Sequence, residues 1–188
     1  MNWYKTAQQD IGQQYNQLLQ QQIASIQIVG PGQNETISIP GGQSINARNL
    51  LEQVKAKIGP LLIENHVRTI DTSPIPNPQA QGLAISHRPG IIFVDVRKIF
   101  DNARKALPPT IQTDGITADK DMANQVVNMV SEWITGELTE TMSHEGQHTH
   151  DFTESFQEGR PFTSVQEGPA EQFGQKIRKQ YYPDSLNY

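Results

Sequence analysis

With 188 residues, the chain has the length of a single domain and can bury a hydrophobic core, although only 35% of its residues are hydrophobic. Its net charge of −5 and its scattered Lys and Arg residues argue against nucleic-acid binding, which usually needs a basic face. The absence of cysteine excludes disulfides and thiolate metal sites, so any metal must be held by His, Asp or Glu.

The first sixty residues are expected to form a helix, a hairpin and a second helix. Residues 1–22 are rich in glutamine and follow helical spacing, with Ile11, Tyr15, Leu18 and Leu19 as apolar contacts. Residues 25–39 are typical of two short strands around a Pro-Gly turn. The second helix begins after Ser44 or Asn46 as N-cap and is expected to end at Gly59-Pro60. No role is indicated for residues 1–60.

Three strand-like runs follow, at residues 66–73, 82–86 and 90–96. The run "PGIIFVDV" is the best candidate for a strand that lines a cleft, where an extended substrate could pair with its edge. Its apolar character fits a buried central strand equally well.

Helical spacing returns from Asp119 onward. Apolar residues recur there every four positions, at Val126, Val130, Ile134, Leu138 and Met142, with Gly136 as a possible interruption. A last helix is expected from about Glu167 to Tyr181 or Tyr182. This order predicts an α+β fold with a small antiparallel or mixed sheet, either as one continuous domain or with residues 61–188 as a separate unit.

The stretch "TMSHEGQHTHDF" contains the pattern H-E-x-x-H at residues 144–148. On a helix, His144 and His148 lie one turn apart on the same face, so both imidazoles can point at one ion. Zinc is well matched to neutral imidazole. Glu145, the neighbour of His144, can reach a water activated by the metal and act as general base. The sequence therefore predicts a catalytic zinc site.

Downstream, "EGPAE" places Glu167, Ala170 and Glu171 at the start of the last helix. Together with H-E-x-x-H, this resembles the gluzincin group of zinc metallopeptidases, with a thermolysin-like active site, and in particular the compact minigluzincin and ImmA/IrrE-like types. The resemblance covers residues 142–176. It implies a zincin-like domain in which Glu167 is the third zinc ligand, Ala170 faces the motif helix and Glu171 orients His144. Asp151 would also support the imidazoles.

Two other zinc-site geometries use different third ligands. In the metzincin pattern, Glu154 would be the third ligand, but Asp151 stands where that pattern has the glycine needed for a sharp reversal. Glu171 remains an alternative third ligand to Glu167. His150 points away from His148 on a helix and is interpreted as a packing or surface residue.

The predicted function is zinc-dependent hydrolysis of a peptide or protein substrate, with Tyr181 or Tyr182 as a candidate donor to the oxyanion. A non-catalytic binding module of the same fold and a phage-associated structural protein are the alternatives. No run of the sequence has the length of a membrane span or the features of a secretory signal, so a cytoplasmic or phage-associated location is expected. The oligomeric state is left open.

Overall fold

The computed structural model describes residues 3–108, 120–159 and 167–186. Within these ranges the fold is α+β, as predicted from the sequence. It has five α-helices, whose bounds are α1 (Trp3–Ser25), α2 (Ala47–Glu64), α3 (Val96–Ala106), α5 (Lys120–Gln157) and α6 (Glu167–Tyr181). Two short 3₁₀ helices are η1 (Pro31–Asn34) and η2 (Pro183–Leu186).

A four-stranded mixed sheet has the order β1-β4-β6-β5. Its strands are β1 (Gln27–Val29), β4 (Thr69–Asp71), β6 (Ile91–Val94) and β5 (Gly82–Ala84). The first three are parallel, and β5 runs antiparallel to β6 at one edge. A separate antiparallel pair joins β2 (Thr36–Ile37) to β3 (Ile45–Asn46).

The hairpin predicted for residues 25–39 is wrong. Strands β1 and β2 both form, but β1 pairs with β4 and β2 pairs with β3. The turn between them is fixed by the end of β4, because the backbone amide of Gly32 donates to the carbonyl of Thr72, and that of Gln33 donates to the Thr72 hydroxyl. Contacts distant in sequence therefore override the local turn pattern.

Helix α2 continues beyond its predicted end. Asn46 is the N-cap, accepting a hydrogen bond from the amide of Asn49, and Pro60 lies inside the helix rather than after it. The buried face, which includes Leu51, Ile58 and Leu62, continues past the proline, so packing outweighs the hydrogen bond that Pro60 cannot make. One hydrophobic core contains residues from both sides of position 60.

Helix α3 was not anticipated. Its N-cap is Asp95, whose buried carboxylate accepts hydrogen bonds from the backbone amides of Lys98 and Ile75. Its inner face packs into the core through Ile99 and Phe100, both fully buried. The strand pattern in "FVDV" therefore ends at Val94, and the two residues that follow cap and begin a helix.

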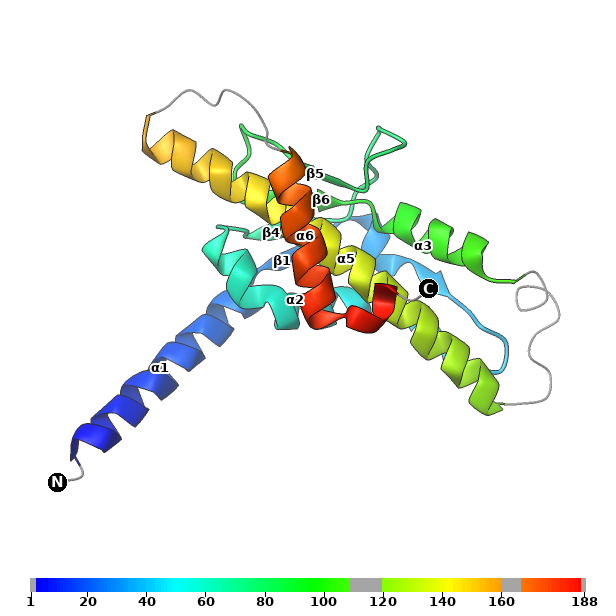
Figure 1. The fold of residues 1–188 in the computed structure, drawn as a ribbon, viewed down its shortest axis with the longest axis horizontal. Coiled ribbons are helices and arrows are strands. Elements are labelled where there is room, and N and C mark those ends of the chain that lie inside the picture. The colour runs from blue at the N-terminus through cyan, green and yellow to red at the C-terminus, as the bar shows by residue number, and fades with distance from the viewer. Residues whose placement is uncertain (1–2, 109–119, 160–166, 187–188) are drawn as a thin grey trace.

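Helix α5 runs without interruption for 38 residues, about 57 Å. The predicted apolar stripe is buried, with Ile134, Leu138 and Met142 at 0% exposure. Gly136 does not break the helix. A Cβ atom there would lie 2.2 Å from the hydroxyl of Ser185, so the glycine allows η2 to pack closely on α5. In Figure 1, α5 crosses the middle of the molecule and α6 lies over it.

A buried arginine fastens α6 to α5. Arg178 is 6% exposed, and its guanidinium contacts the carboxylates of Glu137 and Glu140 on α5 as well as the hydroxyl and carbonyl of Ser185. One turn earlier on α6, a Cβ atom at Gly174 would lie 2.7 Å from the carbonyl of Glu140. The two helices therefore cross at backbone contact, which fixes how α6 is placed along α5.

Helix α1 forms as predicted, but its apolar side chains do not pack as expected. Ile11, Tyr15 and Leu18 are exposed, whereas Ile23, near the end of the helix, is buried in the core. Figure 1 shows α1 extending from the rest of the fold as an arm. None of the described helices, α1 included, is both long and apolar enough to cross a membrane.

Candidate metal centre

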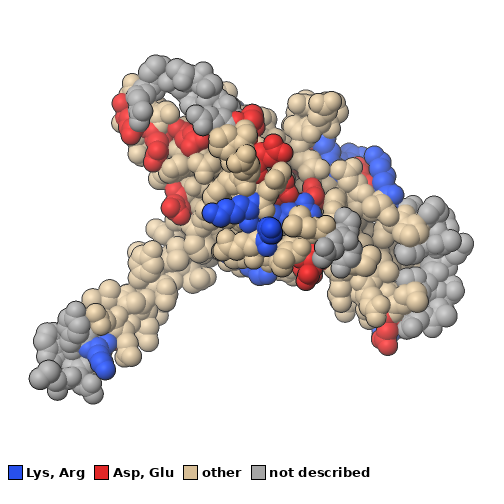
Figure 2. Space-filling model, viewed as in Figure 1, with Lys and Arg blue, Asp and Glu red and all other residues tan. Residues whose placement is uncertain are grey.

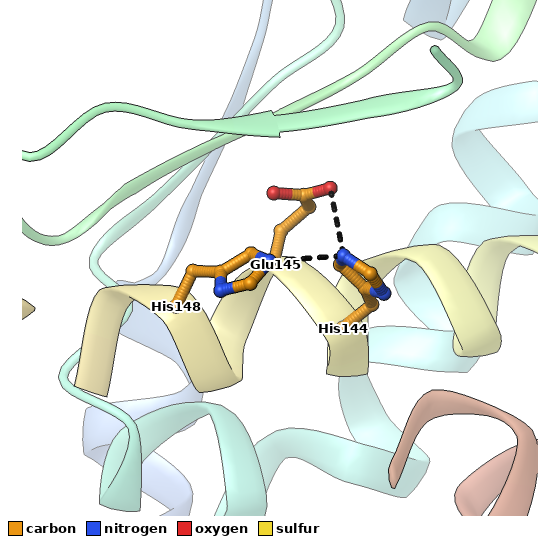
Figure 3. Close-up of side chains that lie close together, drawn as sticks. All are labelled: His144, Glu145 and His148. Atoms are coloured by element: carbon orange, nitrogen blue, oxygen red, sulfur yellow. Dashed lines mark hydrogen bonds and ion pairs between the residues drawn. The ribbon is translucent and has the colours of Figure 1, made fainter. Parts of the chain in front are cut away.

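The two motif histidines lie side by side on α5. His144 and His148 are one helical turn apart, and their Nε2 atoms are 3.0 Å from each other. The rings are nearly perpendicular, with an interplanar angle of 80°. Figure 3 shows both imidazoles rising from the same face of the helix toward the strand above it. This convergence follows from the four-residue spacing alone.

Glu167, the first residue of α6, comes to the same point from a different helix. Its Oε2 atom lies 3.2 Å from Nε2 of His144 and 3.3 Å from Nε2 of His148. The side chain of Glu167 is 68% exposed, whereas that of His148 is 6% exposed. The structure therefore brings together the three residues that the sequence predicted as zinc ligands.

The triangle formed by these three atoms has the size of a zinc site. In a tetrahedral site with bonds of about 2.0–2.1 Å, neighbouring ligand atoms are about 3.3–3.4 Å apart. The three observed separations of 3.0, 3.2 and 3.3 Å are close to this. Hydrogen bonds fit less well, because a ring N–H points in one direction and cannot serve two sides of a triangle. The residues present therefore fit a divalent ion.

The electrostatics of the site favour the neutral form of His144. Burial lowers the pKa of His144, and the neighbouring His148 acts in the same direction. The carboxylates of Glu167 and Glu171 oppose this shift. A neutral ring offers the lone pair that a metal needs, so the ligand state is already preferred near pH 7.

Glu145 lies beside the triangle without being part of it. Its Oε1 atom is 3.9 Å from Nε2 of His144, farther than the three atoms of the triangle are from one another. The residue is 6% exposed, and its carboxylate lies between α5 and β5 (Figure 3). A Cβ atom at Gly82 of β5 would overlap the carboxylate of Glu145, so any larger residue at position 82 would displace this carboxylate from its present place.

Burial raises the pKa of Glu145 from an ordinary 4.5 to about 8, and the charge of Glu167 adds to the shift. A hydrogen bond with the backbone of Ala84 acts in the opposite direction. In the metal-free protein the carboxyl group therefore holds a proton at neutral pH. A bound cation would favour the ionised form, which is the form a general base requires.

This shift predicts how stability depends on pH without metal. Between pH 4.5 and about 8 the folded protein keeps a proton on Glu145 that the unfolded chain releases, so the free energy of unfolding falls as pH rises. Glu145→Gln removes this dependence. Between pH 5 and pH 8, the free energy of unfolding of the variant should fall by about 3 kcal/mol less than that of the wild type. Urea unfolding in the presence of a chelator measures it.

The control for this experiment is Glu171→Gln, which changes an exposed carboxylate of the same cavity. Its pH dependence should follow that of the wild type. Equal slopes for the wild type and the Glu145 variant would contradict the burial argument.

Glu171 and Asp151 were predicted to support the imidazoles. Glu171 lines the same cavity, and its charge acts on His144, but its carboxylate accepts a hydrogen bond from Gln175. Asp151 accepts a hydrogen bond from Gln147 on its own helix. Among the described residues, neither carboxylate is hydrogen-bonded to a motif histidine.

His150 takes no part in the triangle. Its ring stacks on that of His66, with 6.0 Å between centroids, and its Nε2 atom lies 3.3 Å from Glu154. This agrees with its interpretation as a packing residue. Glu154, the third ligand of the alternative metzincin pattern, is likewise placed with His150 and not with His144 and His148.

Tyr181 and Tyr182 do not reach the metal centre. Tyr182 lines a different cavity, together with Lys57 and Glu132, and the ammonium group of Lys57 lies 4.3 Å from the centre of its ring. Tyr181 packs against the hydrophobic core. We therefore do not assign the oxyanion role to either tyrosine.

The candidate metal centre opens into a cleft of about 590 Å³ between α5, α6 and β5. The strand at this cleft is β5, not the predicted β6, which lies between β4 and β5 in the sheet. No described strand pairs with the outer edge of β5.

Residues that sequence reasoning did not assign to the site also line the cleft, among them Asn77, Gln79, Gln81, Gly82 and Thr141. The glycine inside a strand pattern was the one available signal.

The chain was compared with protein-family models, with curated proteins and with solved structures. None of the three comparisons finds a match. The resemblance to the gluzincins therefore depends on the residues of the two motifs alone.

Proposed function

We propose that the protein is a zinc-dependent metallopeptidase with a gluzincin-type active site on a compact zincin-like domain. The observation that carries the proposal is the convergence of His144, His148 and Glu167, whose ligand atoms lie within 3.3 Å of one another although they come from two helices. Glu145 lies beside this triangle, and its side chain is almost completely buried.

The ligand set favours catalysis over a purely structural ion. Structural zinc sites are usually closed by four protein ligands, often cysteines, whereas catalytic sites keep a position open. Here three protein ligands converge, and the site faces a cleft. Bound zinc would supply a Lewis acid that polarises a water molecule and the carbonyl of the substrate.

The remaining chemistry belongs to residues of this chain. Glu145 takes a proton from the attacking water and passes it to the leaving amine, since its carboxylate lies within about one water molecule of the ligand atoms. The packing of Gly82 and the Ala84 backbone against this carboxylate holds it toward the cleft. The base is therefore positioned by the edge strand as well as by its own helix.

The same edge strand offers a place for the substrate. An extended peptide could pair with the outer edge of β5 through main-chain hydrogen bonds, which would lay it across the face of the metal centre. Main-chain pairing recognises an extended conformation rather than a particular side chain. We therefore expect the substrate to be an unfolded or flexible segment of a protein.

The proposal is tested by measuring metal content and hydrolysis together. Protein purified without chelator should contain one zinc per chain and cleave an unfolded protein substrate. A chelator should abolish both, and added zinc should restore both. His148→Ala should remove the metal, whereas His150→Ala, two residues further along the same helix, should retain it. A chain that binds no zinc would rule out the proposal.

A further inference from the structure

We propose that α1 is a dimerisation arm that pairs in antiparallel orientation with α1 of a second copy of this chain. The proposal starts from the position of the helix. α1 spans 23 residues, about 33 Å from first to last Cα, and extends away from the rest of the fold (Figure 1). It is anchored at its end, where Ile23 is buried and a Cβ atom at Gly59 of α2 would lie 2.7 Å from the Ile23 side chain.

The arm carries an apolar seam that nothing in the described fold covers. Ile11, Tyr15 and Leu18 are 67%, 65% and 55% exposed. Their spacing of four and then three residues is the 3.5-residue repeat by which two helices pack along a common seam. The helix also contains Gly12, which disfavours the helical state, and an isolated helix is marginal in water, so α1 is expected to gain stability from a partner surface.

Charge indicates what the partner is. The only charged residues of α1 are Lys5 and Asp10, which cancel, whereas the whole chain has a net charge of −5. Figure 2 shows the arm as largely uncharged surface, with the acidic residues gathered on the body. Such an arm has too few cations for nucleic acid or an anionic membrane. It also lacks the flanking charges with which paired helices select a different partner.

A second copy meets these conditions. Two arms can approach without repulsion, whereas two bodies, which carry all of the net charge, repel each other. The seam is nearly symmetric about Tyr15, so an antiparallel pair would place Tyr15 against Tyr15 and Ile11 against Leu18 of the second copy. This arrangement keeps the bodies at opposite ends of the paired arms. A parallel pair would bring them together.

The first test is the oligomeric state of the full chain. Analytical ultracentrifugation should show a dimer that dissociates on dilution. Ile11→Lys combined with Leu18→Lys should weaken the dimer by at least about tenfold, because both charges enter the seam. The matched control is Gln13→Lys combined with Gln20→Lys, which adds the same charges at the same spacing on the opposite face and should leave the dimer intact. A wild-type chain that stays monomeric up to about 0.5 mM would overturn the proposal, as would equal effects of the two pairs of substitutions.

Orientation can be tested because the chain has no cysteine. In an antiparallel pair Tyr15→Cys should form a disulfide-linked dimer. Ile11→Cys alone should not, because the two cysteines would be about 12 Å apart along the axis, beyond disulfide reach. A mixture of Ile11→Cys and Leu18→Cys chains should cross-link. Efficient self-linking of Ile11→Cys would overturn the antiparallel arrangement.

Discussion

We expect replacement of Glu145 by glutamine to abolish the proposed peptidase activity while leaving bound zinc in place. The amide has nearly the same shape as the carboxylate and still fits under Gly82, but it cannot accept the proton of the attacking water. We expect kcat/KM to fall by about 10³-fold, within the range for losing a general base. Metal content by elemental analysis and cleavage of an unfolded substrate are measured on the same preparation.

The control is Glu171→Gln, which alters another carboxylate of the same cleft and should retain most of the activity. Two other results would be informative. Loss of zinc in the Glu145 variant would make Glu145 a ligand. Retention of full activity would mean that another group is the base. Alternatively, the protein would be a non-catalytic module that binds zinc, and the hydrolysis would come from a contaminating enzyme.

The second large effect is expected at Glu167. Glu167→Gln removes the anionic ligand of the triangle, and we expect zinc affinity to fall by at least about 10²-fold, with hydrolysis lost at limiting metal. The dissociation constant is measured by competition with a chromogenic chelator. Glu171→Gln serves as the matched control, because it is the same change one turn along the same helix.

Stability in the presence of a chelator distinguishes a lost ligand from a damaged fold. The side chain of Glu167 is 68% exposed, so its contacts with the histidines should add little to the metal-free protein. The variant and the wild type should therefore unfold at the same temperature without zinc and at different temperatures with it. If instead Glu171→Gln lost the metal and Glu167→Gln kept it, the third ligand would be Glu171.

The core of the candidate site could be predicted from sequence because it depends on local spacing. A separation of four residues places His144 and His148 on one face of any helix, and the buried stripe before them indicated that the helix was packed. The assignment of Glu167 to the site depended on the resemblance of the second motif to the gluzincins. Residue spacing alone does not predict that α6 packs back against α5. That return depends on Gly174 and Arg178, whose roles are visible only in the folded chain.

Features that depend on pairing between distant segments were not predictable in this way. The order of strands decided that β5 and not β6 lies at the cleft, and the same kind of non-local pairing separated β1 from β2. Helix length by itself excludes Tyr181 from the site, because fourteen residues separate it from Glu167 on one helix. That is about 21 Å, too far for both to serve one reacting centre.

The buried contacts of Arg178 give α6 one attachment to α5, and the proposed metal ion would give it a second. Arg178 fastens the helix about three turns beyond Glu167, and a bound ion would fasten its first turn. Withdrawal of the ion should therefore release only the beginning of α6, while the arginine end stays docked. Amide hydrogen exchange would then become faster near Glu167 and remain slow near Arg178, so loss of the metal would open the first turn of α6 without undocking the helix.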